Sequence, residues 1–152
     1  MERIKGKFTQ APLSATPGEY RIPAGWFVIS HRWIIDHQSA TVEEKKKLRR
    51  MHGCWFRIKN QEREIYRILR FSPNLQGSKK KGDGVICLDW PGWIELSNYE
   101  ETEKPLDLVL EEAGWWRFPQ FVMSHPDPMF RLAGFLGLLS VALGLLSLIL
   151  AR

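Results

Sequence analysis

Residues 132–151 have the sequence LAGFLGLLSVALGLLSLILA, which contains no ionisable side chain over 20 residues. At about 1.5 Å per residue, a helix of this length extends about 30 Å, which matches the hydrocarbon core of a bilayer. Asp127 can serve as its N-cap and Pro128 as its first helical residue. A core helix of a soluble protein need not be apolar around its whole circumference. We therefore predict a transmembrane helix over residues 128–152.

The charges on the two sides of this segment predict its orientation. Of the 22 Lys and Arg residues, only Arg152 follows the apolar run, and Arg131 immediately precedes it. Cytoplasmic flanks carry the excess of positive charge, so we expect the N-terminal domain in the cytoplasm and the C-terminus on the opposite side. The sequence MERIKGK at the N-terminus lacks the apolar core of a secretory signal peptide. This agrees with a single-pass, tail-anchored protein.

Small residues recur within the apolar run at spacings that place them on one stripe of a helix, about 80° wide. They are Ala133, Gly137, Ser140, Gly144, Ser147 and Ala151. Helices associate in membranes through close backbone approach and hydroxyl hydrogen bonds, because lipid tails are as apolar as leucine. The stripe predicts packing against a neighbouring helix, either of another copy of the chain or of a different protein.

Residues 1–113 are predicted to form one cytoplasmic α+β domain. Apolar residues alternate or run continuously, as in strands, over residues 3–8, 20–22, 26–33, 54–59, 63–71, 85–90 and 93–96. Residues 60–62 are short enough for a hairpin turn, and residues 72–84 have the composition of a loop. We therefore expect a small β-rich fold, either a curved antiparallel sheet or barrel-like, carrying one surface helix.

That helix is expected to begin at Thr41, which with Glu44 forms a capping-box pattern, and to end at Gly53. Residues 90–93, with sequence WPGW, favour a turn because they contain both proline and glycine. Residues 106–113 fit either a helix or an edge strand.

The segment 114–127 is rich in aromatic residues and connects the domain to the apolar helix. Aromatic rings favour the membrane interface, and we expect this connector to lie on the headgroup layer or against a neighbouring subunit. Its alternative is packing into the core of the domain itself. The candidate interface residues are Trp115, Trp116, Phe118, Phe121, Phe130 and Arg131.

Positive charge is concentrated between residues 45 and 81, where 13 Lys and Arg residues stand against two Glu. A basic surface next to a bilayer can bind lipid headgroups, an acidic protein or a phosphate-rich ligand, although most charged runs are simply solvated. The candidate residues are Lys45, Lys46, Lys47, Arg49, Arg50, Lys79, Lys80 and Lys81.

No recognised catalytic or nucleotide-binding motif is present, and no cofactor or metal is expected. The closest grouping of suitable side chains is His31 with Asp36 and His37, a combination that is common without function. Cys54 and Cys87 are expected to be free thiols, because two isolated cysteines do not make a disulfide framework.

These features favour a non-catalytic accessory or assembly subunit of a larger membrane complex. Seven tryptophans exceed what a small core can absorb, which favours a docked domain. The alternative is a membrane-tethered sensor or effector, whose basic domain binds a nucleotide or nucleic acid and signals through a self-associating helix. A membrane enzyme with an unrecognised site is the third hypothesis.

Overall fold

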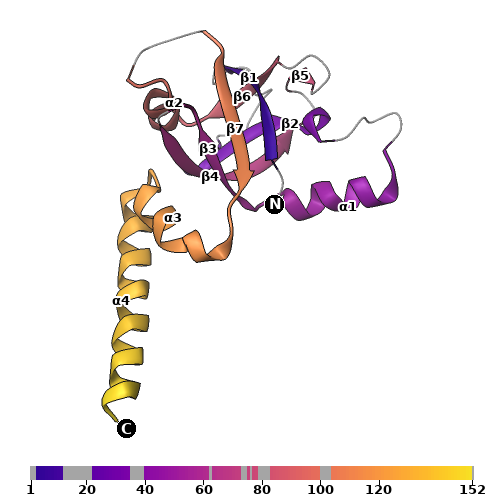
Figure 1. Cartoon of the computed structure of the whole chain (residues 1–152). Coiled ribbons are helices and arrows are strands. Elements are labelled where there is room, and N and C mark those ends of the chain that lie inside the picture. Colours follow the sequence, from indigo (N-terminus) through magenta and orange to yellow (C-terminus); the bar gives the residue numbers. More distant parts are fainter. Residues whose placement is uncertain are drawn as a thin grey trace.

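The computed structural model describes residues 3–11, 22–34, 40–61, 63–72, 75, 77–78, 83–99 and 104–151. A β-barrel forms one end of the molecule, and a long helix, α4, extends away from it (Figure 1).

Six strands close into the barrel in the order β1-β7-β3-β4-β2-β6, and β6 pairs with β1. The strands are β1 (Arg3–Gln10), β2 (Trp26–Ser30), β3 (Trp55–Lys59), β4 (Glu64–Ser72), β6 (Asp83–Leu88) and β7 (Leu106–Glu112). The barrel form is confirmed, but the pairing is not wholly antiparallel. β2 runs parallel to β4, and β1 runs parallel to β6. Parallel neighbours need a long crossover, which helix α1 and strand β3 supply between β2 and β4.

The barrel interior is filled by alternate residues of each strand, because successive side chains point to opposite faces. Each strand contributes a pair of buried apolar side chains to the core: Ile4 and Phe8, Phe27 and Ile29, Phe56 and Ile58, Ile65 and Leu69, Ile86 and Leu88, Leu108 and Leu110. Closure gives each of these strands a paired neighbour on both sides. The segment 106–113 is thus a central strand, paired on both sides, rather than a helix or an edge strand.

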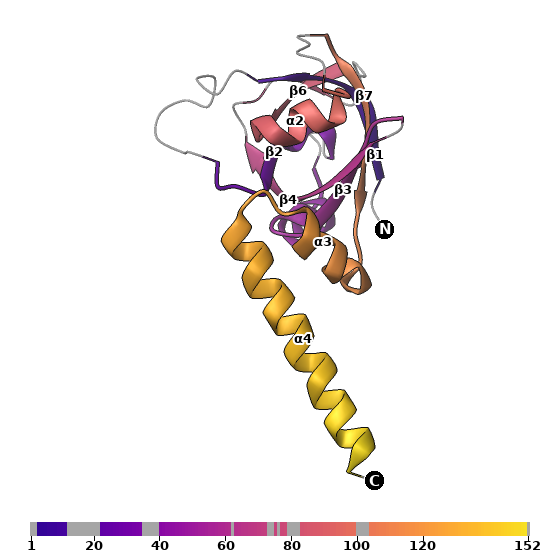
Figure 2. The same ribbon diagram turned by 90° about the vertical axis from the view of Figure 1, so that its left-hand side faces the viewer.

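Helix α2 (Trp90–Leu96) replaces the turn expected at 90–93 and the strand expected at 93–96. Asp89 caps it by accepting a hydrogen bond from the amide of Gly92, and Pro91 lies in its first turn. Trp93 and Leu96, three residues apart, enter the core. Figure 2 shows α2 lying across one opening of the barrel. A short apolar run does not distinguish a strand from a buried helix, which explains the wrong prediction.

Two further segments differ from expectation. The strand predicted over 26–33 ends at Ser30, whose hydroxyl accepts from Arg32 N and begins a 3-10 helix, η2 (His31–Trp33). Within the predicted loop, β5 (Gly77–Ser78) adds a short pairing to β6. The predicted strand at 20–22 lies outside the described residues except for Ile22.

Helix α1 (Val42–Met51) begins with the predicted capping box. Thr41 N donates to Glu44 Oε2 at 2.8 Å, and Glu44 N donates to Thr41 Oγ1 at 3.3 Å. Such a cap stabilises a helix by about 1 kcal/mol. Met51 is the only buried residue of the helix, so α1 is a surface helix as expected.

After β7 the chain forms η3 (Trp115–Arg117), α3 (Phe118–Ser124) and α4 (Pro128–Leu150). The expected single surface helix is therefore accompanied by α2 and α3, both of which pack on the barrel. Asp127 caps α4 as predicted, because Met129 N donates to its Oδ1 at 2.9 Å. No residue of α4 is buried, and α4 is long and apolar enough to cross a membrane.

Candidate functional site

An aromatic cluster joins α3 and α4 to the outer wall of the barrel, and we call it the junction. It consists of Trp55 on β3, Tyr66 on β4, Phe121 on α3, His125 after α3 and Phe130 on α4. Trp55 stacks on Phe121 with ring centroids 4.5 Å apart and an interplanar angle of 5°. His125 stacks on Phe130 at 4.1 Å, and Tyr66 contacts Phe121 at 5.1 Å. The strands thus hold the helices through ring contacts.

Two glycines allow the close approaches at this junction. Gly25 has a φ of +84° and lies directly against the imidazole of His125, where a Cβ would overlap the ring. On α4, a Cβ at Gly134 would lie 2.5 Å from Val122 Cγ1. The first contact holds His125 against the residue before β2, and the second brings α4 close to α3.

A buried ion pair ties the barrel to two helices. Arg67 on β4 is 2% exposed and binds Asp89 through two hydrogen bonds, Nε to Oδ1 at 2.6 Å and Nη2 to Oδ2 at 2.9 Å. Its Nη1 also donates to the carbonyls of Tyr66 at 2.9 Å and Ser124 at 3.3 Å. Since Asp89 caps α2 and Ser124 ends α3, one guanidinium connects β4, α2 and α3.

Sequence reasoning missed this ion pair and the role of His125. Arg67 lies midway between the inward-facing Ile65 and Leu69, so the alternation of β4 places it on the inner face, but its partner Asp89 is distant along the chain. Asp89 did carry a signal, because an aspartate followed by a proline-containing turn is a typical helix start.

His125 has a lowered pKa, because burial disfavours its charged form and Arg67 adds repulsion. Asp127 and Asp89 raise the pKa of His125, but by less than burial and Arg67 lower it. Asp127 N donates to His125 Nδ1 at 3.1 Å, which requires a neutral ring that is unprotonated at this nitrogen. Protonation would therefore disrupt the link immediately before α4.

We expect acidification to weaken the junction. His125 releases its proton more readily in the folded chain than in the unfolded chain, where a histidine has its ordinary pKa of 6.5. The contribution of neutral His125 to the free energy of unfolding is then fully present above pH 6.5. It is lost as the pH falls from that value through the lower pKa of the folded state. Unfolding in urea, followed between pH 7.5 and 5, should show this loss in the natural chain and a smaller loss in His125→Gln. Equal pH dependence of the two proteins would contradict the assignment.

A groove of about 780 Å³ lies between the barrel, η3, α3 and α4. We call it the interfacial groove. Its walls include Trp55 from the barrel, Trp115 and Trp116 from η3, Phe118 from α3 and Leu138 from α4. Cys54 and Glu112 contribute its polar groups.

The predicted interface residues surround this groove and the first turns of α4. Trp115 is 84% exposed, Trp116 58% and Phe118 44%, and Phe130 and Arg131 are also exposed. Phe121 differs, because it is 2% exposed within the junction. Phe121 therefore packs against the domain itself, which is the alternative position considered for the connector.

All six residues of the small-residue stripe are exposed. A Cβ at Gly137 or Gly144 would meet no atom within 4 Å. Gly134 and Leu138, the half-buried positions of α4, point to a different part of the helix circumference. Packing against the barrel therefore leaves the stripe uncovered.

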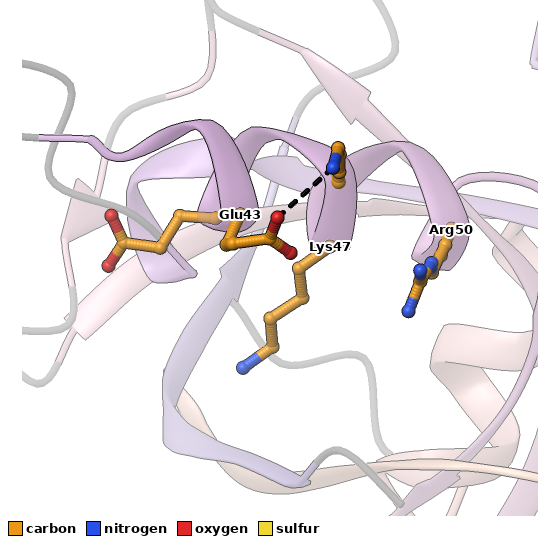
Figure 3. A pocket seen from close by; sticks show the side chains of 5 residues that line it. Glu43, Lys47 and Arg50 are labelled. Atoms are coloured by element: carbon orange, nitrogen blue, oxygen red, sulfur yellow. Dashed lines mark hydrogen bonds and ion pairs between the residues drawn. The ribbon is translucent and has the colours of Figure 1, made fainter.

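Of the eight predicted basic-surface residues, the structure describes the five that lie on α1. All five are exposed: Lys45, Lys46, Lys47, Arg49 and Arg50. Figure 3 shows Lys47 and Arg50 projecting from the same side of α1, in a shallow pocket of about 380 Å³ that Glu43, Glu44 and Lys46 also line. Lys46 Nζ lies 3.0 Å from Glu43 Oε1. The two carboxylates make this pocket poorly suited to a small anion. Lys79, Lys80 and Lys81 lie outside the described residues.

Other cations of the domain form ion pairs along the barrel wall. Arg57 binds Glu111 and lies 3.5 Å from Glu64, and Arg3 lies 3.0 Å from Glu111. These pairs leave α1 as the segment of the described chain with the densest positive charge.

Of the His31, Asp36 and His37 grouping, the structure describes only His31. His31 is buried in η2, and Asp36 and His37 lie outside the described residues. Among the described residues, no three His, Cys, Asp or Glu side chains are placed to hold a metal ion. Cys54 and Cys87 are free thiols whose pKa burial raises.

Comparison with protein-family models, with curated proteins and with solved structures found no match.

Proposed function

We propose that this chain is a non-catalytic accessory subunit of a membrane protein complex, anchored through α4 with its barrel on the cytoplasmic side. The observation that carries the proposal is the arrangement of α4, which is fixed to the barrel at its base and exposes its whole small-residue stripe. A helix held in one orientation presents that stripe in a fixed direction.

The exposed surface of α4 needs an apolar environment. Its leucines, phenylalanines, valine and isoleucine are exposed along nearly the whole helix. Contiguous apolar patches of this kind are covered by lipid or protein in native molecules. A bilayer would cover the bulky side chains, and a neighbouring helix could approach closely over the small ones.

The position of α1 supports the same orientation. α1, η3 and α3 lie at the end of the barrel from which α4 leaves (Figures 1 and 2). If α4 crosses a bilayer, the cations of α1 and the indole rings of η3 face the headgroup layer. Each such cation adds about 1 kcal/mol of attraction to an anionic leaflet.

The alternative function, a sensor that binds a nucleotide or nucleic acid, gains no specific support from the described residues. The α1 pocket contains two carboxylates, and the described lining of the interfacial groove is apolar and aromatic apart from Cys54 and Glu112. Saturable, salt-sensitive binding of nucleotides or RNA to the full chain would favour that alternative.

Adding bulk to the stripe should release the subunit from its complex. The double substitution Gly137→Leu and Gly144→Leu adds side chains where the chain itself leaves open space, so we expect the fold to be kept. The close approach to another helix would be lost. After solubilisation in mild detergent and affinity purification, co-purifying membrane proteins should fall about tenfold relative to the natural chain.

A matched control places bulk on the opposite side of the same helix. Leu139→Phe with Leu146→Phe should leave co-purification unchanged, while all three proteins should resist carbonate extraction from membranes. Unchanged partners in the glycine double variant would exclude the stripe as the contact. Release of the natural chain by carbonate would exclude the anchor itself.

A further inference from the structure

The interfacial groove extends from the barrel into the region of the apolar helix. Its barrel end is formed by Gly53 and Cys54, and its far end by Leu138. Leu138 lies ten residues after Pro128, which is about 15 Å along the axis of α4. If α4 is inserted, the groove runs from the headgroup layer into the hydrocarbon layer.

The walls of the groove suit a flexible apolar chain. Indole and phenyl rings line it, and its volume of about 780 Å³ falls within the range of small-molecule sites. Trp115 and Trp116 are exposed on one wall, so the groove is open along its side and could be filled from the surrounding lipid. An acyl chain could lie in it without leaving the bilayer.

The C-terminal turn of α1 lies beside the barrel end of the same groove. Cys54 Sγ, which lines the groove, donates to the carbonyl of Arg50 at 2.8 Å, so the last turn of α1 borders the opening. That turn carries Arg49 and Arg50. Glu112 also lines this end of the groove, and its negative charge adds to burial in raising the pKa of the Cys54 thiol.

We propose that the interfacial groove binds one anionic glycerophospholipid of the bilayer, with an acyl chain between Trp55 and Leu138 and the phosphate beside the C-terminal turn of α1. The cations of α1 outnumber Glu112, so they favour a negatively charged headgroup. This inference rests on the proposed membrane insertion of α4.

The lipid can be counted by native mass spectrometry of the full chain. The purified protein, in detergent, is mixed with equal amounts of phosphatidylglycerol and phosphatidylcholine, two lipids that differ in headgroup charge. We expect one retained lipid per chain, with about a tenfold preference for phosphatidylglycerol. Ala113→Phe, which fills the groove from its wall, should reduce retention about tenfold. The same change at the exposed Ala142 should have no effect.

A triple variant separates the headgroup from the chain. Lys45→Gln, Arg49→Gln and Arg50→Gln should abolish the preference for phosphatidylglycerol but keep a lipid in the groove. Equal lipid retention by Ala113→Phe and Ala142→Phe would overturn the proposal, as would a lipid-free dimer in which a second copy fills the groove. Carbonate extraction tests the anchor separately, so failure of the groove and failure of membrane insertion are distinguishable.

A second measurement covers the case in which Ala113→Phe does not fold. In the natural chain, a bound lipid should slow alkylation of Cys54 in a saturable manner, whereas Cys87 is fully buried and should react slowly with or without lipid. Lipid-independent alkylation of Cys54 would overturn the proposal without any variant.

Discussion

Substitution of Arg67 by methionine is expected to lower the free energy of unfolding by about 3–5 kcal/mol, as breaking a buried ion pair does elsewhere. Asp89 would lose both of its hydrogen bonds from the guanidinium, and the carbonyls of Tyr66 and Ser124 would lose a donor. The half-buried carboxylate would then be left without its positive partner. Urea unfolding of the full chain in mild detergent, followed by tryptophan fluorescence, measures the loss.

Arg57→Met is the matched control, because Arg57 also pairs with carboxylates but lies on the barrel wall with 21% of its side chain exposed. We expect its loss to be about 1 kcal/mol or less. Replacing both partners, Arg67→Met with Asp89→Leu, should recover part of the stability, since no buried charge remains unpaired. An Arg67→Met protein as stable as Arg57→Met would show that the buried pair does not hold α2 and α3.

Phe121→Ala is expected to cost about 3–5 kcal/mol and to release α3 and α4 from the barrel. Phe121 is 2% exposed, stacked on Trp55 and in contact with Tyr66, so its removal leaves a cavity at the centre of the junction. Hydrogen exchange of the α3 amides should accelerate in the variant, because these amides are protected by docking on the barrel.

Phe118→Ala provides the comparison within the same helix, since Phe118 is 44% exposed. It should cost well under half of the Phe121→Ala loss, about 1 kcal/mol. Similar effects of the two substitutions would mean that the ring contacts of Phe121 do not hold α3 against β3 and β4.

Several elements followed from local sequence. The capping box of Thr41 and Glu44, the cap at Asp127 and the alternating or continuously apolar runs of β1, β3, β4 and β6 all involve residues close together along the chain. The predicted interfacial tryptophans are exposed beside the base of α4, but their role at a membrane stays a prediction.

The sequence alone determined that this chain has a long apolar C-terminal helix, a capped basic helix and short alternating strands, because caps and periodicities are local properties. Only the tertiary structure decided that the strands close into a barrel through the parallel pairing of β1 with β6, far apart along the chain. Likewise, the burial of Arg67, the helical form of 90–96 and the groove beside Trp55 depend on packing partners from distant segments. Such contacts form when the whole domain folds, and no local pattern encodes which distant residues will meet.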